Sequence, residues 1–128
     1  MHWSDKYIGL PYSDHNCAEF VAMVAFDHYN IDIVLPADMG KYLRTQQKKI
    51  NKHLFEYVDA QKLDDPIDGA ICLMHGRKRH CHIGITVIIN KIPYVLHSMT
   101  GCNSVVRHRV IDLHKFNLKV EGFYQWLI

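Results

Sequence analysis

The stretch "HIGITVIINKIPYVLHSM", residues 82–99, decides the fold expected for this chain. Two runs rich in β-branched residues flank the dipeptide Asn90-Lys91, a pattern typical of a β-hairpin. With a two-residue turn at that dipeptide, His82 and His97 project from the same face of the hairpin as diagonal neighbours, at a separation that side chains can bridge. A three-residue turn would place the two histidines on opposite faces.

Three further segments have the composition of strands. They are "AICLM" (70–74), "SVVRHRVI" (104–111) and "VEGFYQWLI" (120–128). With the hairpin they make about five strands, broken by turn residues and consecutive in the sequence. Strands that follow one another in this way, after an N-terminal helical region, favour an α+β domain with an antiparallel sheet.

Two helical segments are expected before the strands. The first begins after Asn16, a good N-cap residue, with Glu19 at the third helical position as in a capping box. It ends at Asn30, and its apolar stripe has helical spacing: Phe20, Val21, Val24 and His28. A second helix is expected over much of residues 38–58, with Arg44, Lys48, Lys49 and Lys52 on a solvated face.

Length, composition and charge indicate a soluble globular domain and argue against a nucleic-acid-binding or membrane-spanning protein. A chain of 128 residues, 48% hydrophobic and 22% charged, is typical of one soluble domain covering residues 1–128. The net charge of +2 gives no electrostatic case for binding nucleic acid. No run of 18 apolar residues predicts a membrane span, and the start lacks the features of a signal peptide, so synthesis in the cytoplasm is expected.

The thiol of Cys17 is the first candidate for chemistry. At a helix N-terminus, backbone N–H groups and the helix dipole favour a thiolate, and the same N–H groups can hold an oxyanion. The alternative is structural, since cysteine is often a small buried apolar residue. The four cysteines contain no CxxC pair, so reduced thiols are expected.

The histidine pair supplies a base for such a thiol. One imidazole of His82 and His97 could take the thiol proton while the other fixes its tautomer, with activity falling below about pH 6 as the pair protonates. Gly84, two residues after His82 on the same face, leaves space beside the imidazole. A histidine on a strand is also often a purely structural residue.

Four motifs then occur in order: "W..KYIGLPY....NC..F", "DGAICLM", "HIGITV" and "YVLHSM". This arrangement, from Trp3 to about Met99, resembles the NlpC-type cell-wall cysteine peptidases in their short, phage-like form. The resemblance implies a papain-like fold. It also implies that Cys17 is the nucleophile, His82 the base and His97 the orienting residue, with Tyr12 and the N–H of Cys17 holding the oxyanion.

The resemblance further implies a substrate and a setting. The substrate would be a peptidoglycan stem peptide, cut between D-glutamate, through its γ-carboxyl, and the diamino acid, by way of a thioester and without metal or cofactor. The protein would reach the cell wall in a phage particle or through a specialised secretion system, with phage tail proteins or a cognate immunity protein as partners. Asn16 stands where the family commonly has aspartate, and Ala18-Glu19 where small residues are usual.

Two other functions compete with the peptidase. His80 and His82, at i and i+2 on a strand, could bind a catalytic metal ion together with His97. A non-catalytic phage-tail assembly module with a peptidase-like fold is the second alternative. Five other residues are expected to have no functional role. Cys72 and Cys81 should lie in the core, Cys102 in a turn, and His108 and His114 on the surface.

Overall fold

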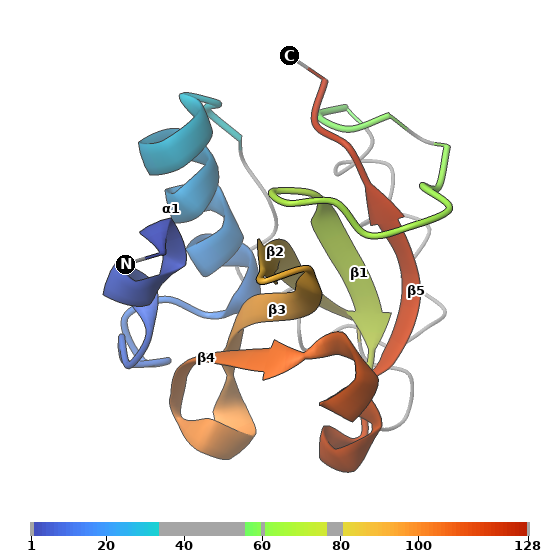
Figure 1. Cartoon of the computed structure of the whole chain (residues 1–128). Coiled ribbons are helices and arrows are strands. Elements are labelled where there is room, and N and C mark those ends of the chain that lie inside the picture. The colour runs from blue at the N-terminus through green and yellow to red at the C-terminus, as the bar shows by residue number, and fades with distance from the viewer. Residues whose placement is uncertain (1, 34–55, 60, 77–80, 128) are drawn as a thin grey trace.

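The computed structural model describes residues 2–33, 56–59, 61–76 and 81–127. Its centre is an antiparallel sheet of five strands in the order β4-β3-β2-β1-β5 (Figure 1). The strands are β1 (Ile71–His75), β2 (Cys81–Ile89), β3 (Ile92–Met99), β4 (Ser104–Arg109) and β5 (Lys119–Tyr124). All five predicted strands are confirmed, and the class is α+β. Two ends differ: Val110 and Ile111 open the 3-10 helix η6 (Val110–Phe116), and β5 ends at Tyr124, with Trp126 only in an isolated bridge.

Of the two turn lengths that the sequence left open, the β2–β3 connection has the two-residue one. Ile89 pairs with Ile92 across it, and both turn residues have left-handed backbone, with φ of 52° at Asn90 and 66° at Lys91. This conformation matches the twist of antiparallel strands. The register that places His82 and His97 on one face is therefore present.

Helix α1 (Cys17–Tyr29) begins and ends where expected. Asn16 accepts a hydrogen bond from the N–H of Glu19, the Glu19 side chain accepts one from the N–H of Asn16, and Asn30 closes the helix with φ of 55°. Phe20, Val21 and Val24 of the predicted stripe are buried. The prediction that His28 belongs to this buried stripe was wrong. His28 is exposed and stacks on Trp3, with ring centroids 4.1 Å apart.

The predicted second helix falls mostly outside the described residues. Its last residues, 56–58, form a turn and an isolated bridge between Val58 and Trp126 instead.

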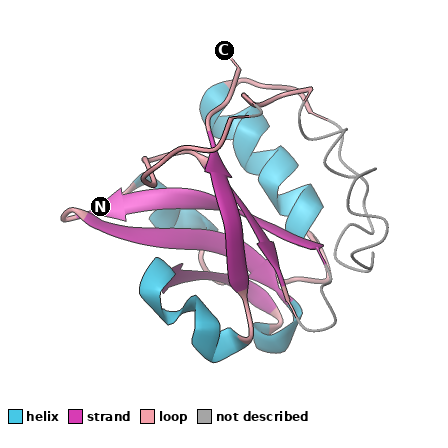
Figure 2. Cartoon of the chain, turned by 90° about the vertical axis from the view of Figure 1, so that its right-hand side faces the viewer, coloured by secondary structure: helices cyan, strands magenta, loops and turns pink. Residues whose placement is uncertain are grey.

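The two faces of the sheet are covered differently. Helix α1 packs on the face that carries Ile83, Ile85 and Leu96. The opposite face carries a second apolar cluster, in which Val95 meets Leu113 of η6. Figures 1 and 2 show α1 and η6 at different sides of the sheet. Within the described residues, no helix has the length and apolar character needed to cross a membrane.

Candidate active site

Three histidines from three neighbouring strands form a continuous chain of hydrogen bonds. His82 Nε2 in β2 lies 2.8 Å from His97 Nδ1 in β3. His97 Nε2 in turn lies 3.1 Å from His108 Nδ1 in β4. The structure thus brings together the two histidines that the hairpin predicted. It also corrects the expectation for His108, which is half-buried and bonded to His97, whereas His114 is exposed as expected.

Packing fixes the rings in place. His97 is fully buried. A Cβ added to Gly84 would lie 3.0 Å from His97 Cβ and 2.6 Å from Val95 Cγ1, so only glycine fits beside the central imidazole. At the outer end, the His108 ring stacks on Phe116 with centroids 3.9 Å apart and planes 9° apart. The row of histidine rings therefore extends from β2 to the residues packed against η6, on the face of the sheet opposite α1.

Burial keeps the three hydrogen-bonded histidines uncharged. It lowers the pKa of His82 to about 4 and that of His97 well below its usual value, the latter assisted by repulsion from His82 and His108. Burial also lowers the pKa of His108, against the attraction of the Asp112 carboxylate. Each ring therefore carries one N–H at neutral pH, and each N···N contact joins one N–H donor to one lone pair.

Cys17 is the first residue of α1, and its side chain is buried, with 1% exposed. The cap uses the N–H of Glu19, and the first helical bond runs from the N–H of Phe20 to the carbonyl of Asn16 at 2.8 Å. The N–H of Cys17 belongs to the same first turn, where backbone donors point outward along the helix axis. The helix start thus has the features that favour a thiolate and an oxyanion.

One hydrogen bond connects the segment before Cys17 to the strand of the histidines. The Ser98 hydroxyl, one residue after His97, donates to the backbone carbonyl of His15. Cys17 packs with the core under α1, whereas the histidines project from the other face of the sheet. The regular pairing of β2 with β3 ends at Ile85 and Leu96, near this point.

Tyr12 is held at the same end of the sheet. Pro11 bridges to Ser104 at the start of β4, and the N–H of Tyr12 donates to the carbonyl of Asn103 at 3.2 Å. Burial raises the pKa of the Tyr12 phenol, and negative charge on Cys17 and Glu19 raises it further. Tyr12 is therefore close enough to Cys17 to sense its charge, and its O–H remains a donor at neutral pH.

The predicted metal site receives no geometric support. His80 lies outside the described residues. Both ring nitrogens of His97 are bonded to other histidines, and the 2.8 Å contact with His82 is shorter than the roughly 3.3 Å between two nitrogens of a tetrahedral zinc site. In the ranges that the structure describes, no three His, Cys, Asp or Glu side chains are arranged to hold a metal ion.

The other cysteines differ from Cys17 in setting. Cys72 is fully buried on the η6 side of the sheet, where burial raises the pKa of its thiol, and Cys102 is exposed in the short 3-10 helix Thr100–Cys102. Both expectations for these residues are confirmed. The side chain of Cys81 lies outside the described part of the chain.

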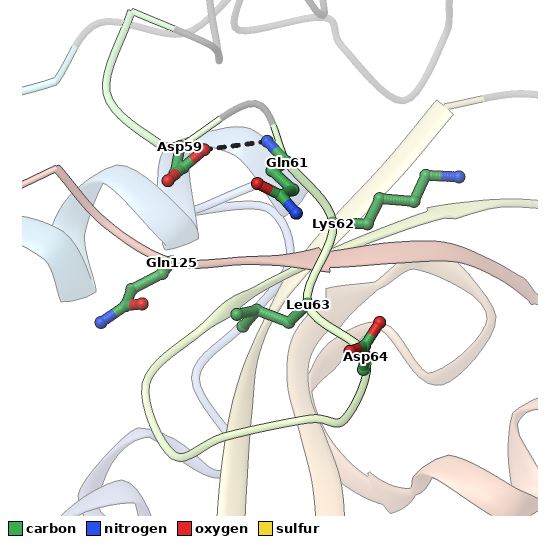
Figure 3. Close-up of a pocket in the computed structure, with 6 residues that line it drawn as sticks. All are labelled: Asp59, Gln61, Lys62, Leu63, Asp64 and Gln125. Atoms are coloured by element: carbon green, nitrogen blue, oxygen red, sulfur yellow. Dashed lines mark hydrogen bonds between the residues drawn. The ribbon is translucent and has the colours of Figure 1, made fainter.

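A surface hollow of about 220 Å³, whose lining Figure 3 draws, lies at the β5 side of the sheet. The strand order places β5 at the edge opposite β4, so the hollow is away from the histidines of β2 to β4. It is lined by Asp59, Gln61, Lys62, Leu63, Asp64 and Gln125. This lining contains neither a thiol nor an imidazole, so the hollow is separate from the candidate site.

No protein-family model matches the chain, and no curated protein or solved structure matches it either.

Proposed function

We propose that this protein is a cysteine peptidase or amidase of the NlpC type that cuts the γ-D-glutamyl–diamino acid bond of peptidoglycan stem peptides. The observation that carries the proposal is the hydrogen bond between His82 Nε2 and His97 Nδ1. Because Nε2 of His82 is engaged in this hydrogen bond, Nδ1 is the nitrogen with which the ring can act as a base. The order of motifs around Cys17, which resembles the family, supplies the nucleophile and the substrate class.

In the proposed reaction, the Cys17 thiol gives its proton to His82 Nδ1 as sulfur attacks the γ-carbonyl of D-glutamate. The N–H of Cys17 and the O–H of Tyr12 stabilise the oxyanion of the tetrahedral intermediate. His82 then returns the proton to the amine of the diamino acid as the C–N bond breaks, which leaves a thioester. Water, deprotonated by His82, hydrolyses the thioester and restores the thiol.

The mechanism sets a requirement on the geometry. Cys17 packs under α1 and the histidines project from the opposite face, so thiol and imidazole must meet at the end of β2 and β3. Two features support such an approach: the Ser98 hydrogen bond draws the segment before Cys17 to β3, and the regular β2–β3 pairing stops at Ile85. His97 has no free ring nitrogen in this scheme and serves only to orient His82.

The test is mass spectrometry of purified muropeptides after digestion. Wild-type protein, Cys17→Ala and Cys102→Ser would be compared, each with and without a chelator. Cys102→Ser is the matched control because its thiol is exposed and open to alkylating reagents. Circular dichroism of each variant establishes that it is folded.

Cleavage at the γ-glutamyl bond by wild type and Cys102→Ser, but not by folded Cys17→Ala, with no effect of the chelator, is the expected result. Cleavage that survives in Cys17→Ala would refute the cysteine mechanism. If the chelator stops cleavage and the Cys17→Ala substitution does not, the result would favour the metal-dependent alternative. A protein that cleaves none of the muropeptides would favour the non-catalytic assembly module.

A further inference from the structure

The histidine chain continues one residue beyond the pair that the proposed mechanism uses. His108 comes from β4, and its Nδ1 meets the Nε2 of the buried His97 at 3.1 Å. Its ring is held flat against Phe116. His108 is therefore held between a hydrogen bond and a ring stack, in a position from which it can determine which nitrogen of the buried His97 carries the proton.

The protons of the three rings are linked. If His108 Nδ1 accepts from His97 Nε2–H, then His97 Nδ1 has a lone pair and must accept from His82 Nε2–H. His82 Nδ1 is then unprotonated. If His108 Nδ1–H donates instead, every ring reverses and His82 carries its proton on Nδ1. A mixed arrangement would put two N–H groups, or two lone pairs, against each other inside the protein, which is costly.

We propose that His108 is a positioning residue of the site: by accepting the Nε2–H of His97 it sets the tautomer of both inner histidines and leaves His82 Nδ1 with the lone pair of a base. The catalytic consequence rests on the proposed function, whereas the tautomers themselves do not. His108 touches neither thiol nor substrate in this scheme and works through two successive hydrogen bonds.

Two substitutions separate the hydrogen bond from the packing. His108→Asn can place its Oδ1 where Nδ1 lies and still accept from His97 Nε2–H. His108→Phe keeps an aromatic ring against Phe116 but offers no acceptor. Phe116→Leu is the reverse control, because it removes the ring stack while all three histidine side chains and their hydrogen-bonding nitrogens are kept.

The direct measurement is nitrogen NMR of the imidazole rings in the uniformly ¹⁵N-labelled full chain at pH 7, without substrate. His82 and His97 are expected as Nε2–H tautomers in wild type, His108→Asn and Phe116→Leu. In His108→Phe the His97 and His82 signals should shift towards a mixture of tautomers. A wild-type His82 protonated on Nδ1 would overturn the proposal, and so would unchanged tautomers in His108→Phe.

Turnover gives a second measurement. We expect kcat/KM to fall about tenfold in His108→Phe, as for the loss of one buried hydrogen bond, and to stay within about threefold of wild type in His108→Asn and Phe116→Leu. Equal losses in His108→Phe and Phe116→Leu would show a packing role and overturn the proposal. If no muropeptide is cut, the proposed function fails while the NMR result still decides the role of His108. If His108→Phe does not fold, the wild-type and His108→Asn tautomers decide it.

Discussion

The hydroxyl of Ser98 donates a hydrogen bond to the backbone carbonyl of His15, two residues before Cys17. Ser98 is fully buried and directly follows His97 in β3. A single side chain therefore joins the segment that leads into α1 to the strand that carries His97. Cys17 and the histidine pair come from parts of the chain about 65 to 80 residues apart, and this bond links the segment before Cys17 to β3.

Ser98→Ala should therefore impair activity more than stability. Removing the donor leaves the His15 carbonyl unsatisfied and should cost about 1 kcal/mol in the free energy of unfolding, measured by urea denaturation. In the proposed mechanism this bond also links the segment before Cys17 to the strand of His97, so kcat/KM should fall by about tenfold or more. Ser104→Ala is the matched control, since that hydroxyl bonds to the carbonyl of Cys102 at an exposed turn. Equal effects of the two substitutions would contradict a role for Ser98 in the site.

The two inner histidines should differ in their contributions to catalysis. His82→Ala removes the proposed base, and loss of a general base typically lowers an enzyme's rate by about 10² to 10⁴. His97→Ala removes only the partner that orients it, so a smaller loss is expected. Muropeptide turnover by the two variants, with exposed His114→Ala as control, checks this order. A larger loss for His97→Ala would reverse the roles assigned here.

Stability should fall as the pH is lowered from about 6.5 towards 4. The pKa of His82 is about 4 in the folded protein and about 6.5 unfolded, so between these values the unfolded chain binds more protons. At pH 5 this costs about 2 kcal/mol for His82, and His97 adds to it because burial also lowers the pKa of its ring well below the usual value. Urea denaturation at pH 7 and pH 5 would measure the slope. His82→Asn should flatten it.

The same pKa changes the expected pH dependence of activity. An unperturbed histidine pair would lose activity below about pH 6. With the pKa of His82 held near 4, the base stays unprotonated at pH 5, so the acidic limb of the kcat/KM profile should lie nearer pH 4 than pH 6. Initial rates on a muropeptide between pH 4 and 8 would measure it. A midpoint at or above pH 6 would show that the thiolate or a more exposed histidine controls the rate.

Gly84→Ala should damage the site by crowding. The new methyl group would lie 2.6 Å from Val95 Cγ1, 2.9 Å from the Leu96 carbonyl oxygen and 3.0 Å from His97 Cβ. Relieving such contacts in a packed core costs about 1–3 kcal/mol, and the shift of His97 should also lower turnover. Gly101→Ala is the matched control, because its methyl group would meet only Met99 Cε, at 3.5 Å. Thermal denaturation of both variants is the measurement.

Local patterns predicted the elements of this fold better than they predicted its contacts. The Asn90-Lys91 turn reduced the hairpin register to two choices of face, because the side-chain period of a strand is two, and the two-residue turn of the structure selects one of them. The start of α1 followed from the capping box of Asn16 and Glu19. These signals lie within a few residues of what they determine, and all were confirmed.

His108 was misjudged because its environment is not local. Its neighbours in sequence, Arg107 and Arg109, are charged and suggested an exposed strand. Its burial comes from η6 folding back over β4 and from the His97 ring on the next strand. One signal was present: with β3 and β4 paired, alternation places His108 on the same face as His97. The pairing register needed for that step depends on the turn around residues 100–103, which the sequence leaves open.

The pairing of residues 9–12 with β4 has a consequence for association between molecules. β4 is an edge strand, and exposed edges pair readily with strands of other chains. Here Gly9 donates to the carbonyl of Val105, Val105 donates to that of Leu10, and Tyr12 donates to that of Asn103. The segment that positions the Tyr12 phenol thus also covers the start of this edge and blocks sheet extension there. Loss of the segment would expose a template for intermolecular β-sheet, so its removal should promote aggregation as well as inactivation.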